Sequence, residues 1–321
     1  MKTLFRELEK VYRLVDKVNG HGRVELLGTV DVKAHRLPIY GFQFGSKDPT
    51  APTFGLFGGL HGLEKIGTEL AVYFLYNLVE RLEWNKQLQE LLEKIRVVSI
   101  PLLNPGGMYL GTRSNPNGVD LNRNSPSTSD GKKLFLASGH RLSPNLPWYG
   151  GVKDKLEFEN EILVEFVKKN MLNAKFSLAL DLHSGFGVKD RLWFPYSKTS
   201  EPFPYYDIAS RIKNLVDSNM KHHIYQIEPQ ADSYIIEGDI WDHLFDIHYN
   251  TKNHKEDIFV PWTLEMGSWI WVKKNPLQLM NIDGMFNPYR EHRFKRVMRR
   301  HWRLLDLYMN LCANHEGWLY E

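Results

Sequence analysis

The sequence predicts an α/β fold: one domain over residues 1–321 with a mixed, mostly parallel β-sheet flanked by helices. Three observations predict it. Short β-branched runs alternate with longer stretches of helical spacing, helical segments stand between successive strands as in parallel crossovers, and no linker or internal repeat divides the chain. In such sheets, chemistry is carried by the loops at the strand ends.

The first elements can be placed from their periodicity. A helix is expected over residues 3–18, where apolar residues recur at helical spacing, and three strands separated by turn residues follow within 23–59. A long helix is expected from Leu63 to Leu82, because its apolar residues mark one buried face. The β-branched run RVVSIPLL (96–103) is then expected to form a central strand.

Residues 104–131 are rich in Asn, Gly, Pro and Ser, and we expect them to be mostly loop. The connection from Asn104 to Gly151 is long for a compact domain, and long ordered loops are often functional. The remaining expected elements are helices over 156–169, 203–219 and 289–312, and strands over 176–182, 224–227 and 259–267.

Composition excludes several classes of protein. The 41 Lys and Arg residues nearly balance the 38 Asp and Glu residues, which gives no reason to expect a nucleic-acid or membrane partner. The single cysteine, Cys312, excludes an internal disulfide framework and a cysteine-built zinc site. Charges interrupt the N-terminal stretch, so no signal peptide is expected and the predicted location is cytoplasmic. The sequence leaves the oligomeric state open.

The segment GGLHGLEKIGTE (58–69) carries the first candidate ligands. His61 and Glu64 lie three residues apart where a strand gives way to a helix, so both side chains can face one point. Imidazole and carboxylate are good zinc ligands. The alternative is an exposed pair at a helix start, where a glutamate also suits the helix dipole.

Two further residues follow predicted strands. His183 comes just after the strand at 176–182, although a histidine there could simply bond a backbone carbonyl. Two histidines and one carboxylate would make a three-ligand catalytic zinc site that leaves a position for water. Glu265, in TLEMGSW, lies in an apolar run, where a carboxylate needs a partner or a task unless it faces solvent.

The loop GTRSNPNGVDLNRN (111–124) combines two arginines with several asparagines. Arg113 and Arg123 present planar guanidinium groups that match a carboxylate, and the asparagines add neutral hydrogen bonds. The alternative is a solvated Asn/Gly turn.

Together these motifs resemble the zinc carboxypeptidase family, the metallocarboxypeptidases of the carboxypeptidase A type. The resemblance covers roughly residues 54–266, a catalytic core that lies between an N-terminal helix-and-strand region (1–50) and a C-terminal helix (289–312). Its motifs stand in the family's order: the His61/Glu64 pair, NPGG (104–107), GTR (111–113), VDLNRN (119–124), LDLHSG (180–185) and TLEMG (263–267). GTR followed by NGVDLNRN is most similar to the bacterial branch that includes murein-peptide amidases.

The resemblance implies a role for each site residue. One Zn²⁺ per chain would be held by His61, Glu64 and His183. Glu265 would serve as general base toward zinc-activated water and then as general acid, with Arg113 stabilising the oxyanion. The remaining roles concern the substrate and the ligands: Asn122 and Arg123 for the terminal carboxylate, Tyr234 in a substrate loop with Tyr225 and Tyr249 as alternatives, and Asp120 as acceptor from His61.

The implied activity is a zinc metallocarboxypeptidase, a hydrolase that cleaves a peptide or amide bond next to a free terminal carboxylate. An alternative is a zinc-dependent acylase of the aspartoacylase and succinylglutamate desuccinylase type, acting on an N-acyl amino acid. In that group the second histidine comes sooner and a sizeable domain follows the glutamate, whereas here His183 comes 122 positions after His61 and 56 residues follow Glu265. A third reading is an inactive carboxypeptidase fold used for binding, although both the base and the oxyanion arginine have candidates.

Two other segments are assigned no chemistry. The acidic and histidine-rich group at 239–248 could suggest a second metal site, but its spacing fits no single face, and we expect a solvated segment. The basic stretch 290–303 also carries apolar residues at helical spacing, which favours a docked helix with a charged outer face over nucleic-acid binding.

Trp241 is a candidate for the wall of the pocket that takes the leaving residue.

Overall fold

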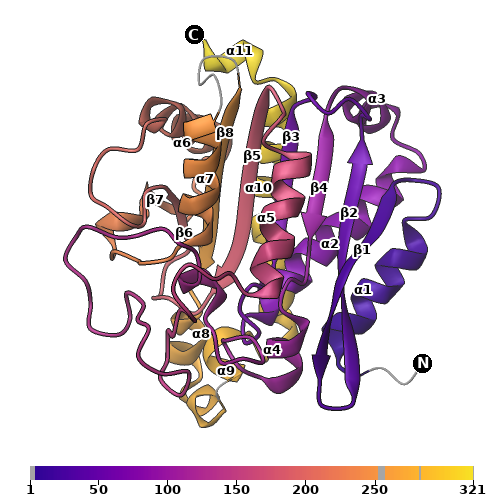
Figure 1. Cartoon of the computed structure of the whole chain (residues 1–321). Coiled ribbons are helices and arrows are strands. Elements are labelled where there is room, and N and C mark those ends of the chain that lie inside the picture. Colours follow the sequence, from indigo (N-terminus) through magenta and orange to yellow (C-terminus); the bar gives the residue numbers. More distant parts are fainter. Residues whose placement is uncertain (1–3, 252–256, 282, 321) are drawn as a thin grey trace.

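The computed structural model describes residues 4–251, 257–281 and 283–320 (Figure 1). Up to the fourth strand, the elements are α1 (Arg6–Lys17), β1 (Arg23–Val32), β2 (His35–Gly45), β3 (Thr53–Gly58), α2 (Lys65–Leu82), α3 (Lys86–Lys94) and β4 (Arg96–Ile100). The later elements are α4 (Pro105–Leu110), α5 (Phe158–Asn170), β5 (Phe176–Ser184), β6 (Arg191–Phe194), α6 (Tyr206–Asn219), β7 (Gln226–Pro229), α7 (Ile240–Thr251), β8 (Ile258–Met266), α8 (Trp269–Lys274), α9 (Asp283–Phe286), α10 (Glu291–Ala313) and α11 (Glu316–Leu319).

The strands form one eight-stranded sheet in the order β1-β2-β4-β3-β5-β8-β6-β7. Its middle strands β4, β3, β5 and β8 are parallel to one another, while β1, β2 and β6 pair antiparallel with neighbours. Every residue of β3 and β5 is buried, as expected for parallel strands covered on both faces. The predicted mixed, mostly parallel sheet is therefore confirmed.

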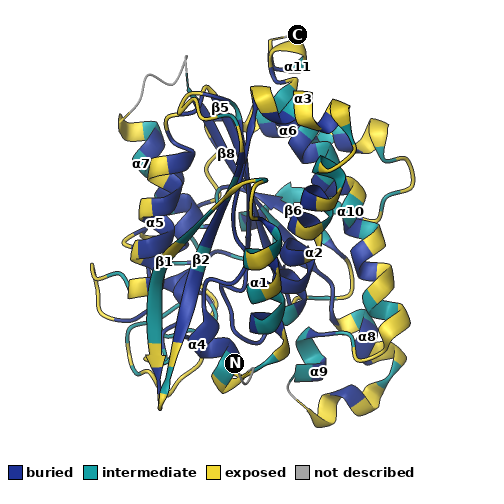
Figure 2. Ribbon diagram, turned by 90° about the vertical axis from the view of Figure 1, so that its right-hand side faces the viewer, coloured by how far each residue is buried: buried dark blue, intermediate teal, exposed yellow. Residues whose placement is uncertain are grey.

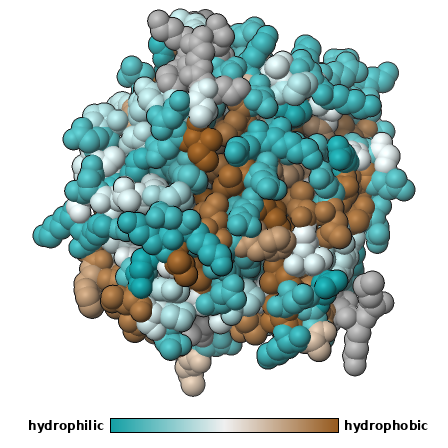
Figure 3. Space-filling model, in the orientation of Figure 1, coloured by the Kyte–Doolittle hydropathy of each residue, from teal (hydrophilic) through white to brown (hydrophobic). Residues whose placement is uncertain are grey.

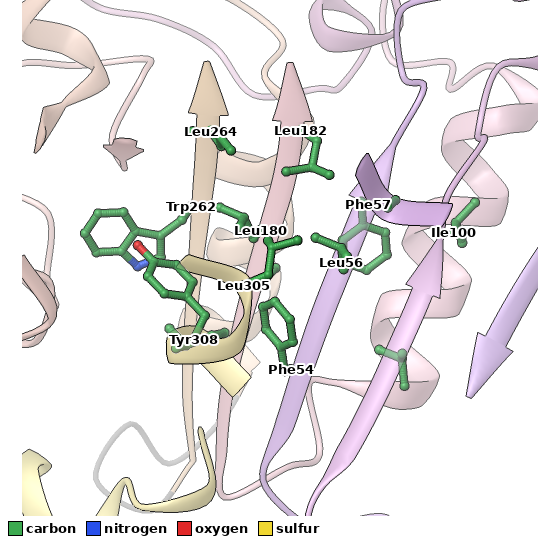
Figure 4. Packing of buried hydrophobic residues seen from close by; sticks show 14 of the residues in the cluster. Phe54, Leu56, Phe57, Ile100, Leu180, Leu182, Trp262, Leu264, Leu305 and Tyr308 are labelled. Atoms are coloured by element: carbon green, nitrogen blue, oxygen red, sulfur yellow. The ribbon is translucent and has the colours of Figure 1, made fainter. Parts of the chain in front are cut away.

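Helices cover both faces of this sheet. Helices α5 and α7 lie on the face nearer the viewer in Figure 1, and α2 and α10 lie on the other, as the turned view of Figure 2 also shows. Figure 4 shows how α10 reaches the middle strands: Tyr308 lies beside Trp262 of β8, with ring centroids 5.9 Å apart, and beside Phe54 of β3 at 6.5 Å. The outer surface of the first face is mostly hydrophilic, with apolar residues gathered toward its middle (Figure 3).

The ends of the parallel strands define where a site can form. Helices α4 and α8, which follow β4 and β8, lie with α9 at the lower end of the molecule in Figure 1. The carboxyl ends of the middle strands therefore face that end, together with the loops that follow them. In open α/β sheets, ligands bind outside these strand ends.

Residues 104–131 are mostly loop, as predicted, although they begin with the short helix α4, which Asn104 caps through its side chain and in which Pro105 occupies the first turn. Other sequence predictions need correction. Residues 239–248 are not a solvated segment: most of them form the start of α7, in which Asp242 and His248 are buried. The short strand β6 and the helix α3 were not predicted. In the part of the chain that is described, no helix combines the length and apolarity that a membrane crossing requires.

Candidate active site

Strand pairing brings distant parts of the sequence together at one edge. His183 near the end of β5 is the register partner of Glu265 near the end of β8. On the other side of β5, Leu182 pairs with Gly58, the last residue of β3, three residues before His61. The histidines and Glu265 thus meet because three parallel strands end together.

A glycine allows the helix that follows β3 to approach β5 closely. A Cβ atom at Gly67, in the first turn of α2, would lie 2.4 Å from the carbonyl oxygen of Leu182. This approach places Glu64, the residue just before α2, beside the end of β5. The backbone N–H of Ser184 donates to Glu64 Oε2 at 2.9 Å and fixes that carboxylate.

The three predicted ligands converge. His61 Nδ1 lies 2.8 Å from Glu64 Oε1, and His183 Nδ1 lies 3.1 Å from Glu64 Oε2 and 3.2 Å from His61 Nδ1. All three side chains are buried, and their ligand atoms lie within 4.8 Å of one another. They form the one group of at least three His, Cys, Asp or Glu side chains with this geometry among the described residues.

Carboxylates hold the other nitrogen of each imidazole. His61 Nε2 lies 3.1 Å from Asp120 Oδ1, the partner that the resemblance implied. His183 Nε2 lies 2.7 Å from Asp181 Oδ2, and the same oxygen accepts the indole N–H of Trp241 at 2.7 Å. Carboxylates in these positions favour the tautomer with the proton on Nε2, which leaves both Nδ1 lone pairs facing Glu64.

This arrangement fits a metal ion. When both imidazoles are neutral, their lone pairs and the two carboxylate oxygens are all acceptors, and at separations near 3 Å they repel one another unless a proton or a metal cation lies between them. Two nitrogens and one carboxylate are the ligand types of catalytic zinc sites, and the carboxylate partners behind the imidazoles are typical of such sites.

The electrostatics of the ligands follow from this crowding. Burial by itself would raise the pKa of Glu64, but the imidazoles of His61 and His183 outweigh it and hold that pKa below its ordinary value. Burial would lower the pKa of His183, but Asp181 and Glu64 outweigh it and raise that pKa well above its ordinary value. Protons and a metal ion would therefore compete for this site.

Glu265 lies at the same strand edge, with its carboxylate fixed on one side. The backbone N–H of Phe186 donates to Glu265 Oε1 at 3.0 Å. Burial, followed by the nearby charge of Glu64, raises the pKa of Glu265 to about 8. A carboxyl group held in this range is suited to exchanging a proton near neutral pH.

Arg113 joins the ligand carboxylates to the loop that carries it. Its Nη1 donates to Glu64 Oε1 and its Nε donates to Asp120 Oδ2, each at 2.9 Å. Its side chain is 27% exposed and lines the cleft described below. The structure thus places Arg113 beside the metal ligands, and its role toward an oxyanion stays a prediction.

A cavity of about 350 Å³ opens over these groups and is lined by His61, Glu64, His183 and Glu265 together with Arg113, Asn122, Arg123 and Tyr234. Among the described residues Arg123 makes no ion pair; it donates to backbone carbonyls of Asn122 and Ala137. Asn122 Oδ1 is buried without a partner in the part that is described. The cavity therefore offers an incoming ligand the guanidinium of Arg123 as a donor and the amide oxygen of Asn122 as an acceptor.

The three tyrosine candidates lie in different places. Tyr234 lines the cavity, with its ring 5.4 Å from Phe186 and 5.9 Å from Trp193 between centroids. Tyr225 instead bonds His301 at 2.9 Å, and Tyr249 stacks on Phe245. The geometry favours Tyr234 as the tyrosine that could meet a ligand, while its role stays a prediction.

Trp241 is not where we expected it. It does not line the cavity but lies behind His183, buried, where it donates to Asp181. The sequence analysis did not identify Asp181 as a site residue. It could have done so, because residues two apart in a strand share a face, which places the aspartate of LDLHSG on the same side as His183.

Comparison with known proteins agrees with this geometry. A family model described as zinc carboxypeptidase matches residues 34–268. The chain is 29% identical over 182 residues to the carboxypeptidase N catalytic chain of Rattus norvegicus, an alignment that covers 51% of this chain but only 38% of that protein. A carboxypeptidase E of Caenorhabditis elegans is 37% identical over 106 residues, 28% of this chain and 22% of that one.

Solved structures share the fold over nearly the whole chain. Bovine thrombin-activatable fibrinolysis inhibitor, bound to tick carboxypeptidase inhibitor, aligns with a TM-score of 0.69 at 17% identity and covers 97% of both chains. Carboxypeptidase A from Helicoverpa armigera aligns with a TM-score of 0.66 at 16% identity, over 94% of this chain and 71% of that one.

Proposed function

The chain belongs to the zinc carboxypeptidase family, and from this premise we propose that it is a zinc-dependent carboxypeptidase that hydrolyses a peptide or amide bond next to a free terminal carboxylate. One observation carries the proposal: His61, Glu64 and His183 converge in a cavity that also presents Glu265 and the cation of Arg123. A base and a carboxylate-binding group beside one metal site are what this reaction needs.

Zinc bound by His61, Glu64 and His183, one ion per chain, would polarise the scissile carbonyl and acidify a water molecule. Glu265 accepts a proton from the attacking water; since Oε1 is bonded to the Phe186 N–H, Oε2 is the oxygen that remains for it. As the carbonyl carbon gains the water oxygen and its C–N bond breaks, Glu265 returns that proton to the leaving nitrogen. With a divalent cation at the ligands, Glu265 would ionise more readily, because the charge of Glu64 is then offset.

The other residues of the cavity orient the substrate. Arg123 and Asn122 would bind the terminal carboxylate of the leaving residue, and Arg113 would donate to the developing oxyanion. Tyr234 would pack against the substrate at the cavity wall. Arg123 makes no direct ion pair within the described chain, so its guanidinium can meet a substrate carboxylate, while the buried carboxylates of Asp120 and Asp239 lie near enough to offset part of its charge.

The acylase alternative would use the same ligand residues. The zinc carboxypeptidase match over residues 34–268 favours the peptidase. Because the aligned regions span less than half of the two curated relatives described above, side-chain preference and natural substrate are left to experiment.

The test is hydrolysis by the zinc-loaded protein of matched peptides with a free or an amidated C-terminus, a murein tripeptide and an N-acyl amino acid, with released products identified by mass spectrometry. We expect release of C-terminal residues from the free acids only, and loss of this activity with a chelator or in Glu265→Gln. Cleavage of the N-acyl amino acid alone, or equal cleavage of amidated peptides, would overturn the proposal.

A further inference from the structure

A second hollow lies outside the cleft and shares none of its lining residues. It is formed by the turn after α6, residues 220–225, and by the outward face of α10, and it measures about 380 Å³. An adjoining hollow of about 430 Å³ shares Ile224, Arg296 and Arg300 with it. Figure 2 shows α10 running along the side of the molecule with many exposed turns.

The lining of this hollow is strongly basic. Positions 296, 299, 300 and 303 recur at helical spacing, so four arginines of α10 lie on one face. Lys221 and His222 face them from the turn. We call this group the basic hollow: Lys221, His222, Arg296, Arg299, Arg300 and Arg303.

Neighbouring acids do not neutralise these charges. Arg300 pairs with Asp190 at 3.0 Å, but Arg296, Arg299 and Arg303 make no ion pair within the described chain. The other nearby acids are used elsewhere: Asp217 pairs with Lys213 and His223, and Asp306 pairs with Arg81. Several like charges therefore share one concave surface, an arrangement that repels itself until an anion binds.

The shape indicates what kind of anion fits. From Arg296 to Arg303 a helix rises about 10 Å, which is the length of two or three linked phosphoryl groups rather than of an extended strand. Guanidinium groups match phosphate oxygens with two parallel hydrogen bonds. The side chain of Arg300 is held by Asp190, whose other oxygen accepts the Gly267 N–H at 3.0 Å, so one donor of the hollow is already fixed.

From this we propose that the basic hollow is a binding site for a compact polyphosphate, a molecule that carries two or three adjacent phosphoryl groups. The concave wall formed by residues 220–225 favours such a ligand over a nucleic-acid strand, which needs an open basic track with aromatic platforms. The inference does not depend on the proposed function, because it uses no residue of the cleft.

The test is isothermal titration of the full chain with inorganic tripolyphosphate, with a nucleoside triphosphate, and with a single-stranded oligonucleotide, each at low and physiological salt. The test variant replaces three exposed arginines of the hollow: Arg296→Gln, Arg299→Gln and Arg303→Gln together. The control variant removes the same charge from exposed lysines elsewhere: Lys86→Gln, Lys94→Gln and Lys153→Gln.

We expect tripolyphosphate to bind the wild type with one site and the test variant at least tenfold more weakly, with less than a twofold change in the control variant. Tighter binding of the nucleoside triphosphate would identify an organic source of the phosphates, and tighter binding of tripolyphosphate an inorganic one; both support the site. If tripolyphosphate affinity fell equally in the test and control variants, binding would depend only on the overall charge of the protein, and the proposed site would be overturned. Binding of the oligonucleotide in preference to both phosphates would also overturn it.

Discussion

Asp181 offers the sharpest test of how the metal site is held. Its Oδ2 accepts from His183 Nε2 and from the Trp241 indole, each at 2.7 Å. In Asp181→Asn both donors still point at one atom, so the amide oxygen must take that place and the amide nitrogen must turn away. The hydrogen bonds survive but the negative charge behind His183 is lost.

The expected magnitude follows from that change. A carboxylate behind a ligating imidazole raises its basicity, and its loss costs about 10- to 100-fold in metal affinity. At about 1.4 kcal/mol per tenfold change, Asp181→Asn should weaken zinc binding by about 1.4 to 3 kcal/mol. Trp241→Phe is the matched control, because it removes the indole donor and leaves the carboxylate on His183, so its effect on zinc affinity should be smaller.

The assay is zinc competition against a chromophoric chelator at neutral pH, with thermal unfolding of each metal-free variant as a check on folding. If Asp181→Asn binds zinc within twofold of the wild type while His183→Ala loses it, Asp181 does not support the ligand and the reasoning fails. A larger loss in Trp241→Phe than in Asp181→Asn would place the effect in packing rather than in charge.

Four further outcomes are expected. Elemental analysis should find about one zinc per chain, lost in His61→Ala and in His183→Ala; full zinc in both variants would contradict the ligand set. Glu265→Gln should retain zinc and lower kcat by at least about a hundredfold, whereas near-normal turnover would remove Glu265 as the base. Arg123→Ala should lower kcat/KM mainly for substrates with a free carboxylate, and equal losses on amidated substrates would argue against its role. Burial lowers the pKa of His301 to about 4, so the unfolded chain binds a proton between about pH 6.5 and 4 that the folded chain does not. Because other buried groups titrate in this window too, the prediction concerns a difference: in urea unfolding of the metal-free protein, the stability lost as pH falls should be about 3 kcal/mol smaller in His301→Gln than in the wild type, and equal losses would exclude His301 as a cause.

The parts of the fold that could be predicted are those whose burial is uniform or periodic. The strand at 176–182 and the helix at 65–82 have apolar patterns that continue along their length, and both lie within two residues of their expected positions. Helix α7 could not be recognised in the same way. Ile240, Leu244 and His248 lie on its buried face. Because one of these residues is a histidine and several neighbours are acidic, the segment has the composition of an exposed one, and its helical periodicity was not recognised.

Part of the candidate active site could likewise be predicted from the sequence, and part could not. His61, Glu64 and His183 could be proposed because each lies at or shortly after the end of a strand, and strand ends meet in parallel sheets. Of the carboxylates behind the histidines, Asp120 was implied by the resemblance and Asp181 could have been found from its strand spacing, but the contacts made by Trp241 and Arg113 are not encoded in sequence spacing. Trp241 donates to Asp181 from 60 positions away, and Arg113 meets Glu64 from a loop 49 positions away. These two hydrogen bonds could be identified only from the tertiary structure.

The same comparison explains why the candidate active site stands out physically. Glu64, Asp120, Asp181 and Glu265 are all buried within one neighbourhood, and within the described chain Arg113 is the cation that forms ion pairs with two of them. A core built only for stability would not collect so many buried carboxylates, because each costs free energy unless it is paired. A divalent cation bound by the two imidazoles and Glu64 would offset much of this charge. The buried carboxylates, whose burial costs folding free energy, are therefore the same residues that the proposed metal chemistry requires.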